Sequence, residues 1–111
     1  MEIEGQVIRK SKSRDVSLIK VPLKITNSLY LKFQIPDIAS DVYAAGTPID
    51  EALKTTVTKG IISNIRVDNA SGLKFIQADA SISPGNSGGP LFDKFGNVIG
   101  ISVAKYNTNS A

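Results

Sequence analysis

The chain has 111 residues, which is enough for one hydrophobic core and too little for two domains of ordinary size. Its hydrophobic fraction of 41% and charged fraction of 21% are typical of a globular protein, and no apolar run approaches the roughly 20 residues that span a bilayer. The net charge of +3 is too small an excess to indicate nucleic-acid binding. The sequence has no Cys and no His, so we expect no disulfide framework, no metal site and no cofactor.

The first part of the chain predicts a β-hairpin. Polar and apolar residues alternate from Ile3 to Arg9, a basic loop follows, and Val16 to Val21 forms a second strand-like run that ends before Pro22. Leu29 to Phe33 is a weaker strand candidate, and Val42 to Ala45 is a short apolar run.

The middle of the chain predicts further strands. Ile49 to Thr56 could form one or two helical turns before Val57 to Val67 resumes as a strand. Gly60 inside that strand predicts a bulge or a close backbone approach. Asp68 to Gly72 is a turn cluster that leads into a strand at Leu73 to Ala78.

The last part of the chain predicts a second hairpin, in which the turn "DKFG" separates "LF" from "NVIGISVA". No stretch holds a helical period over the dozen or so residues of an ordinary helix. Many short strands with regular turn signals indicate an all-β fold, either a closed barrel or a sandwich.

The stretch "SPGNSGGPLF" presents Ser87 within a run of glycines. It satisfies G-x-S-x-G, but that nucleophile elbow joins a strand to a helix, and here Pro90 and a hairpin follow. A phosphate-binding loop is also excluded, because no Lys-Ser or Lys-Thr follows the glycines. A third interpretation is an oxyanion hole formed by Gly85, Asn86 and Ser87, in which the N–H groups of Gly85 and Ser87 point into one pocket.

The run "GNSGGP" resembles the G-D-S-G-G-P signature of chymotrypsin-like serine proteases. The longer segment "FIQADASISPGNSGGPLFDKFGNVIGISVA" is similar to the HtrA/Deg branch of that family, in which Asn replaces Asp as Asn86 does here. The competing interpretation is a turn in an unrelated β protein, which a match over thirty residues disfavours.

The resemblance implies the second, Greek-key six-stranded β-barrel of the trypsin-like fold, over residues 25–111. An N-terminal hairpin, residues 1–24, would be left from the first barrel. The similarity extends from Ile3 to Lys105 and is weakest over Pro22 to Ser40. The chain departs from the branch at Gly46-Thr47-Pro48, where Gly-Asn-Pro is usual.

The resemblance also implies a catalytic triad in the order His, Asp, Ser. In that order the histidine would precede this chain, and an aspartate near the start should survive. Asp15 is the candidate, because "RDVSLIKV" resembles the HtrA segment that carries the catalytic Asp, with Ser17 where Ala is usual. Asp79 lies closer in sequence to Ser87, but we interpret it as a structural hydrogen-bond acceptor.

By the same resemblance, Ile82 and the strand Val103, Ala104 and Lys105 would frame the specificity pocket and pair with an extended substrate. Ile82 is equally well explained as a core residue.

We therefore predict a serine endopeptidase that acts on polypeptides, present here as a portion without its histidine and inactive alone. A non-catalytic peptide-binding barrel is the alternative, and a nucleic-acid-binding barrel is disfavoured. We also expect self-association, as a homo-oligomer or a strand-exchanged dimer. No membrane span is predicted, and the resemblance favours a periplasmic or other extracytoplasmic location.

Overall fold

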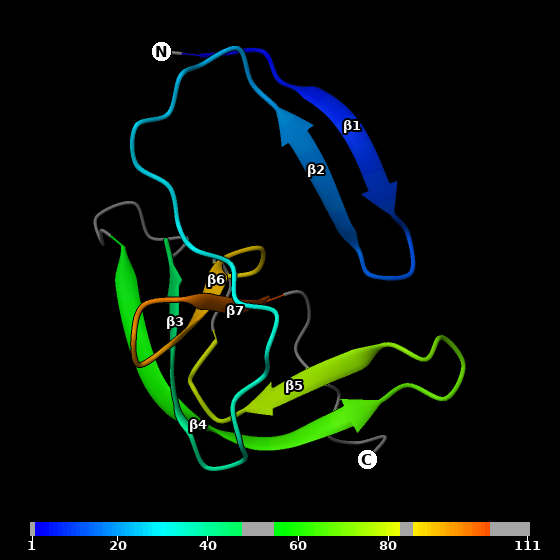
Figure 1. The fold of residues 1–111 in the computed structure, drawn as a ribbon, viewed down its shortest axis with the longest axis vertical. Coiled ribbons are helices and arrows are strands. Elements are labelled where there is room, and N and C mark those ends of the chain that lie inside the picture. The colour runs from blue at the N-terminus through cyan, green and yellow to red at the C-terminus, as the bar shows by residue number, and fades with distance from the viewer. Residues whose placement is uncertain (1, 48–54, 83–85, 103–111) are drawn as a thin grey trace.

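The computed structural model describes residues 2–47, 55–82 and 86–102, and every regular element within them is a β-strand. The predicted all-β class is confirmed. The first sheet has two antiparallel strands, β1 (Gln6–Ser11) and β2 (Val16–Lys20), and stands apart from the larger sheet (Figure 1). The predicted N-terminal hairpin is therefore present, although its first strand begins at Gln6 and not at Ile3.

The second sheet has five antiparallel strands in the order β5-β4-β3-β6-β7 and curls into a half-barrel (Figure 1). Its strands are β3 (Asp41–Gly46), β4 (Thr56–Val67), β5 (Lys74–Ala78), β6 (Pro90–Asp93) and β7 (Val98–Ile101). β4 to β7 correspond to strand runs predicted from sequence, and β3 contains the short apolar run Val42 to Ala45. The described residues thus supply five strands of the six-stranded barrel that the resemblance implies.

Leu29 to Phe33 does not form the strand predicted for it. It makes one parallel bridge, Leu31 with Val98, supported by a 2.7 Å hydrogen bond from the Val98 N–H to the Tyr30 carbonyl. Tyr30 is 82% exposed and Phe33 is 93% exposed, so burial of these two side chains does not stabilise a longer pairing. Most of the predicted helical segment at Ile49 to Thr56 lies outside the described residues; Thr56 itself opens β4.

The 12-residue strand β4 joins the two halves of the sheet, because it pairs with β3 through its first half and with β5 through its second. Gly60 lies at the changeover, where a β-carbon would stand 2.7 Å from the Cα of Ala80. The close backbone approach predicted at Gly60 is confirmed, and no larger residue fits there without displacing the neighbouring chain.

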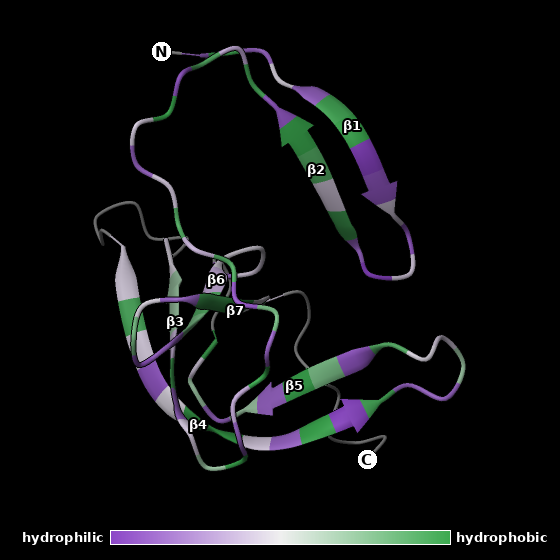
Figure 2. Ribbon diagram, viewed as in Figure 1, coloured by the Kyte–Doolittle hydropathy of each residue, from purple (hydrophilic) through white to green (hydrophobic). Residues whose placement is uncertain are grey.

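The core is a small cluster of buried apolar residues. Alternate residues of β3, Val42 and Ala44, are fully buried, and Ile62 of β4 packs against them with Ala80 and Leu91. The hairpin β1–β2 contributes no residue to this cluster, and its apolar positions are visible on both strands in Figure 2. Among the described residues, the larger sheet and the segments next to its strands, with Ala80, Ile35 and Ile82, therefore build the core.

The turn between β6 and β7 is organised by Asp93, which is 5% exposed. Its carboxylate accepts hydrogen bonds from the N–H groups of Phe95 and Asn97, both at 2.9 Å, and from the Asn97 side chain at 3.0 Å. Lys32 lies 3.9 Å away. Burial acts to raise the pKa of Asp93, but the hydrogen bonds and the Lys32 charge outweigh it and hold the pKa below its ordinary value.

Replacing Ile62 with Ala should lower the free energy of unfolding by about 2–5 kcal/mol, because a fully buried side chain leaves a cavity. Ile25 is 64% exposed, and Ile25→Ala should change it by no more than about 0.5 kcal/mol. Urea denaturation followed by circular dichroism measures both. Equal losses in the two variants would contradict the assigned core.

The stabilisation from Asp93 should depend on pH. Because its pKa is lowered in the folded state, its contribution is present above the ordinary value of 3.8 and is lost as the pH falls through the folded-state pKa. Asp93→Asn should therefore lower the urea midpoint at pH 7, and the difference from the parent chain should shrink towards pH 2. Asp41→Asn is the control, since its 4.0 Å contact with Lys59 is exposed and worth at most about 1 kcal/mol.

Candidate active site

The turn that carries Ser87 is shaped by its own backbone. Gly88 has φ +86°, a conformation that favours glycine, and the Gly89 N–H donates a 2.8 Å hydrogen bond to the Asn86 carbonyl. The Asn86 side chain is buried below the turn at 1% exposure, whereas Ser87 is exposed. The sequence "NSGG" thus presents the serine hydroxyl on a tight turn with its neighbour anchored in the interior.

The same turn is joined to the end of β7. The Gly88 N–H donates to the Ser102 carbonyl, and the Ser102 N–H donates to the Gly89 carbonyl at 2.9 Å. This reciprocal pair extends the β6–β7 ladder past Ile101 and holds the turn beside the chain that leaves the sheet.

Asp15 lies at the turn of the β1–β2 hairpin. It adopts φ +54°, and its N–H donates a 3.4 Å hydrogen bond to the Lys12 carbonyl. Aspartate tolerates this left-handed conformation better than most residues, which is one local reason for its place in the turn. The residue is exposed.

Asp15 and Ser87 line the same cavity, which has a volume of about 300 Å³. The hairpin supplies Asp15, Val16 and Ser17, and the larger sheet supplies Ser87, Gly88, Ile101 and Ser102. Two residues that are 72 positions apart in the chain are therefore brought to one cavity by the approach of the hairpin turn to the turn that carries Ser87.

Of the other site residues predicted from sequence, only some lie among the residues that the structure describes. Ile82 is half-buried and packs against the core cluster. Gly85 and the segment Val103, Ala104 and Lys105 lie outside the described residues. Sequence reasoning did not select the cavity-lining residues Ile101 and Ser102, although their position at the end of a strand opposite the glycine turn was a usable signal.

Asp79 is not part of this cavity. Its carboxylate accepts a 2.7 Å hydrogen bond from the Ile61 N–H, and its own N–H donates to the Ile61 carbonyl at 3.2 Å. The Thr58 hydroxyl adds a 2.7 Å hydrogen bond to the Ser81 carbonyl. The structure thus shows Asp79 as a hydrogen-bond acceptor that ties the segment before the nucleophile turn to β4.

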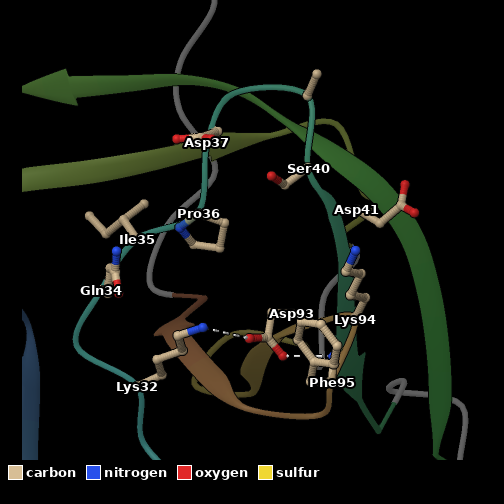
Figure 3. Close-up of a pocket in the computed structure, with 11 residues that line it drawn as sticks. Lys32, Gln34, Ile35, Pro36, Asp37, Ser40, Asp41, Asp93, Lys94 and Phe95 are labelled. Atoms are coloured by element: carbon tan, nitrogen blue, oxygen red, sulfur yellow. Dashed lines mark hydrogen bonds and ion pairs between the residues drawn. The ribbon is translucent and has the colours of Figure 1, made fainter.

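A larger cavity of about 460 Å³ lies elsewhere, between the segment that precedes β3 and the β6–β7 turn (Figure 3). It contains the Lys32–Asp93 ion pair and shares no lining residue with the cavity at Ser87. Lys32 and Asp93 form an ion pair there, and the Asp93 carboxylate already accepts the hydrogen bonds of the β6–β7 turn.

Within residues 2–47, 55–82 and 86–102, no three acidic side chains come together in a way that could hold a metal ion. The same part of the chain has no helix of the length and apolar character needed to cross a membrane.

Comparison with known proteins decides the family. The trypsin-like peptidase domain matches residues 2–101. The chain belongs to the trypsin-like peptidase family, in its HtrA/Deg branch. It is 34% identical to the magnetosome formation protease MamE of Magnetospirillum gryphiswaldense, over 96% of the chain and 14% of that protein. It is 39% identical to a probable periplasmic serine endoprotease, DegP-like, of Pseudomonas fluorescens, over 95% of the chain and 22% of that protein.

Solved structures of the HtrA/Deg branch have the same fold. The HtrA-type protease AlgW with a decapeptide superposes with a TM-score of 0.80 and 33% identity, over 95% of this chain and 33% of AlgW. Deg5 superposes with a TM-score of 0.76 and 28% identity, over 93% of this chain and 52% of Deg5. The chain therefore spans between about a seventh and a half of the length of these HtrA/Deg relatives.

Proposed function

We propose that this chain carries the nucleophile and the acidic member of the active site of a serine endopeptidase. Ser87 is the nucleophile, Asp15 is the acidic partner, and the N–H groups of Gly85 and Ser87 form the oxyanion hole. The observation that carries the proposal is the shared cavity, because it unites the only two residues that the family's triad order would assign to this chain.

The reaction is acyl transfer. The Ser87 Oγ attacks the carbonyl carbon of a peptide bond while a base takes the hydroxyl proton, and the negative charge that develops on the carbonyl oxygen is stabilised by the two N–H groups. The intermediate collapses to an ester on Ser87, and the base returns the proton to the departing amine. A water then attacks the ester by the same route and releases the acid.

The base is a histidine supplied from outside this sequence, since the sequence contains none. The cavity of about 300 Å³ between Asp15 and Ser87 has room for an imidazole that would accept the Ser87 proton and donate its other N–H to Asp15. Losing the histidine of such a triad lowers kcat by about a million-fold, so the chain alone should be almost inactive.

The two sheets fit a division of the chain between two barrels. Residues 1–24, with the β1–β2 hairpin, belong to the first barrel, and residues 25–111 belong to the second. The hairpin supports this division because its strands carry Val7 and Ile8 at 47% and 49% exposure, and Leu18 and Ile19 at 56% and 54%. Such a two-stranded ribbon is rarely stable unless a further surface covers it.

The substrate is a polypeptide, bound in extended form along Val103, Ala104 and Lys105 with a small aliphatic side chain at Ile82. AlgW with its decapeptide supports the substrate class. The name of the DegP-like relative supports an extracytoplasmic, periplasmic location.

The second candidate is a non-catalytic barrel that binds peptides through the same strand. The absence of histidine from the sequence favours it. The two candidates differ in whether a base, once supplied, activates Ser87.

A fluorophosphonate probe tests this difference, because Ser87 Oγ displaces fluoride from phosphorus when a base removes its proton. Labelling of the chain should be slow. It should rise at least about ten-fold in added imidazole, since general-base help contributes about 100- to 10,000-fold in a formed site. Mass spectrometry of the labelled peptide measures the site, and Ser87→Ala is the control. Labelling that imidazole and an upstream histidine-bearing extension both leave unchanged would exclude the protease and favour the peptide-binding barrel.

The exposed hairpin should also cause self-association. Light scattering at rising concentration should show a dimer or larger species, because an unpaired apolar hairpin finds another edge or face. The paired substitution Leu18→Lys and Ile19→Glu should shift the population towards monomer, whereas Ile101→Lys on β7 serves as an edge control with less effect. A monomer at all concentrations would contradict this expectation.

A further inference from the structure

The end of β3 lies directly under the nucleophile turn, and the two segments touch through glycines. We propose that Gly46, the last residue of β3, is a positioning residue for Ser87: it provides the surface on which the Asn86–Gly89 turn rests. This inference depends on the proposed role of Ser87 for its catalytic meaning, but the contact itself is independent of that role.

The first contact joins Gly46 to Asn86, the residue before the nucleophile. A β-carbon at Gly46 would stand 2.6 Å from the Asn86 Cα and 2.7 Å from its Cγ, and would collide with Oδ1. Backbone atoms cannot turn aside as the end of a flexible side chain can. Any side chain at position 46 must therefore displace the turn or the strand.

The second contact joins the same two segments through Gly89 and Ala45. A β-carbon at Gly89 would collide with the Ala45 carbonyl oxygen and stand 2.9 Å from the Asn86 carbonyl oxygen. Gly46 and Gly89 thus allow two lengths of backbone to lie closer than any side chain would permit. Ser87 lies between the two contact points.

Neither segment has room to retreat. β3 is fixed by Val42 and Ala44 in the core and by the pairing of Gly46 with Thr56. Asn86 is 1% exposed, and its side-chain Oδ1, which has no hydrogen-bond partner among the described residues, is packed against Gly46.

The far side of the turn is tied down as well, by the two hydrogen bonds between Ser102 and the glycines at 88 and 89. A displacement introduced at Gly46 must consequently be absorbed by the turn itself, where Ser87 lies. A shift of about 1 Å at a reacting group costs about 100-fold in rate.

The experiment compares Gly46→Ala with Gly100→Ala in the complete chain. Gly100 is the matched control, because it lies in the same sheet and its added β-carbon would meet Ile76 Cδ1 at an ordinary 3.6 Å. Neither glycine has a positive φ, so alanine strains neither backbone. Amide resonances measured by NMR report the contact, and fluorophosphonate labelling in imidazole reports its consequence.

Gly46→Ala should move the amide resonances of Asn86 to Gly89. It should lower the saturating labelling rate constant of Ser87 by about 10- to 100-fold, with a smaller change in the half-saturating probe concentration. Gly100→Ala should do neither. Ile62→Ala should lower stability without changing the labelling rate of the folded chain, which separates positioning from general loss of stability.

Unchanged amide resonances in Gly46→Ala, or equal effects in Gly100→Ala, would overturn the inference. If the parent chain shows no base-dependent labelling, the proposed function fails, and the amide resonances still decide the contact. Should Gly46→Ala not fold, adding Asn86→Ala removes Cγ and Oδ1 from the collision and leaves only the 2.6 Å approach to the Asn86 Cα, so it should recover part of the stability that Gly46→Ala loses. A double variant that is no better than Gly46→Ala also overturns the inference.

Discussion

Close approach of backbone to backbone is the constraint on which this structure depends. At Gly60 the chain that leads towards the nucleophile crosses β4, and at Gly46 and Gly89 the nucleophile turn rests on β3. In each place a side chain would push apart two backbone segments that lie in direct contact. The larger sheet therefore supplies most of the core, and in our proposal the end of β3 also fixes the position of the turn that carries Ser87.

The aspartates Asp15, Asp79 and Asp93 fall into two groups according to their surroundings. Asp79 and Asp93 are satisfied by backbone N–H groups and stabilise the chain around the turn and the last hairpin. Asp15 lies instead on an exposed turn and lines the cavity that Ser87 also lines. The carboxylates of Asp79 and Asp93 accept hydrogen bonds that stabilise the fold. Asp15, which we propose for catalysis, lines a cavity in which a base can bind.

Much of the fold was predictable, because alternation and turn residues act locally. The strands β3 to β7 and the N-terminal hairpin follow from them, as does the close approach at Gly60. The prediction failed at Leu29 to Phe33, where apolar, strand-prone residues make a single bridge because no second surface covers them. Local propensity does not reveal whether a partner strand is available.

The sequence by itself determined the local shape of the turn that carries Ser87: Gly88 takes a φ of +86°, which favours glycine, and Gly89 leaves room for the Ala45 carbonyl oxygen. It also shows that the chain contains no histidine. Only the tertiary structure decided that Asp15 and Ser87 share a cavity, and that Gly46 lies under the turn. In both cases the residues are far apart in the chain, and the distance between them in space depends on how the hairpin and the strands pack.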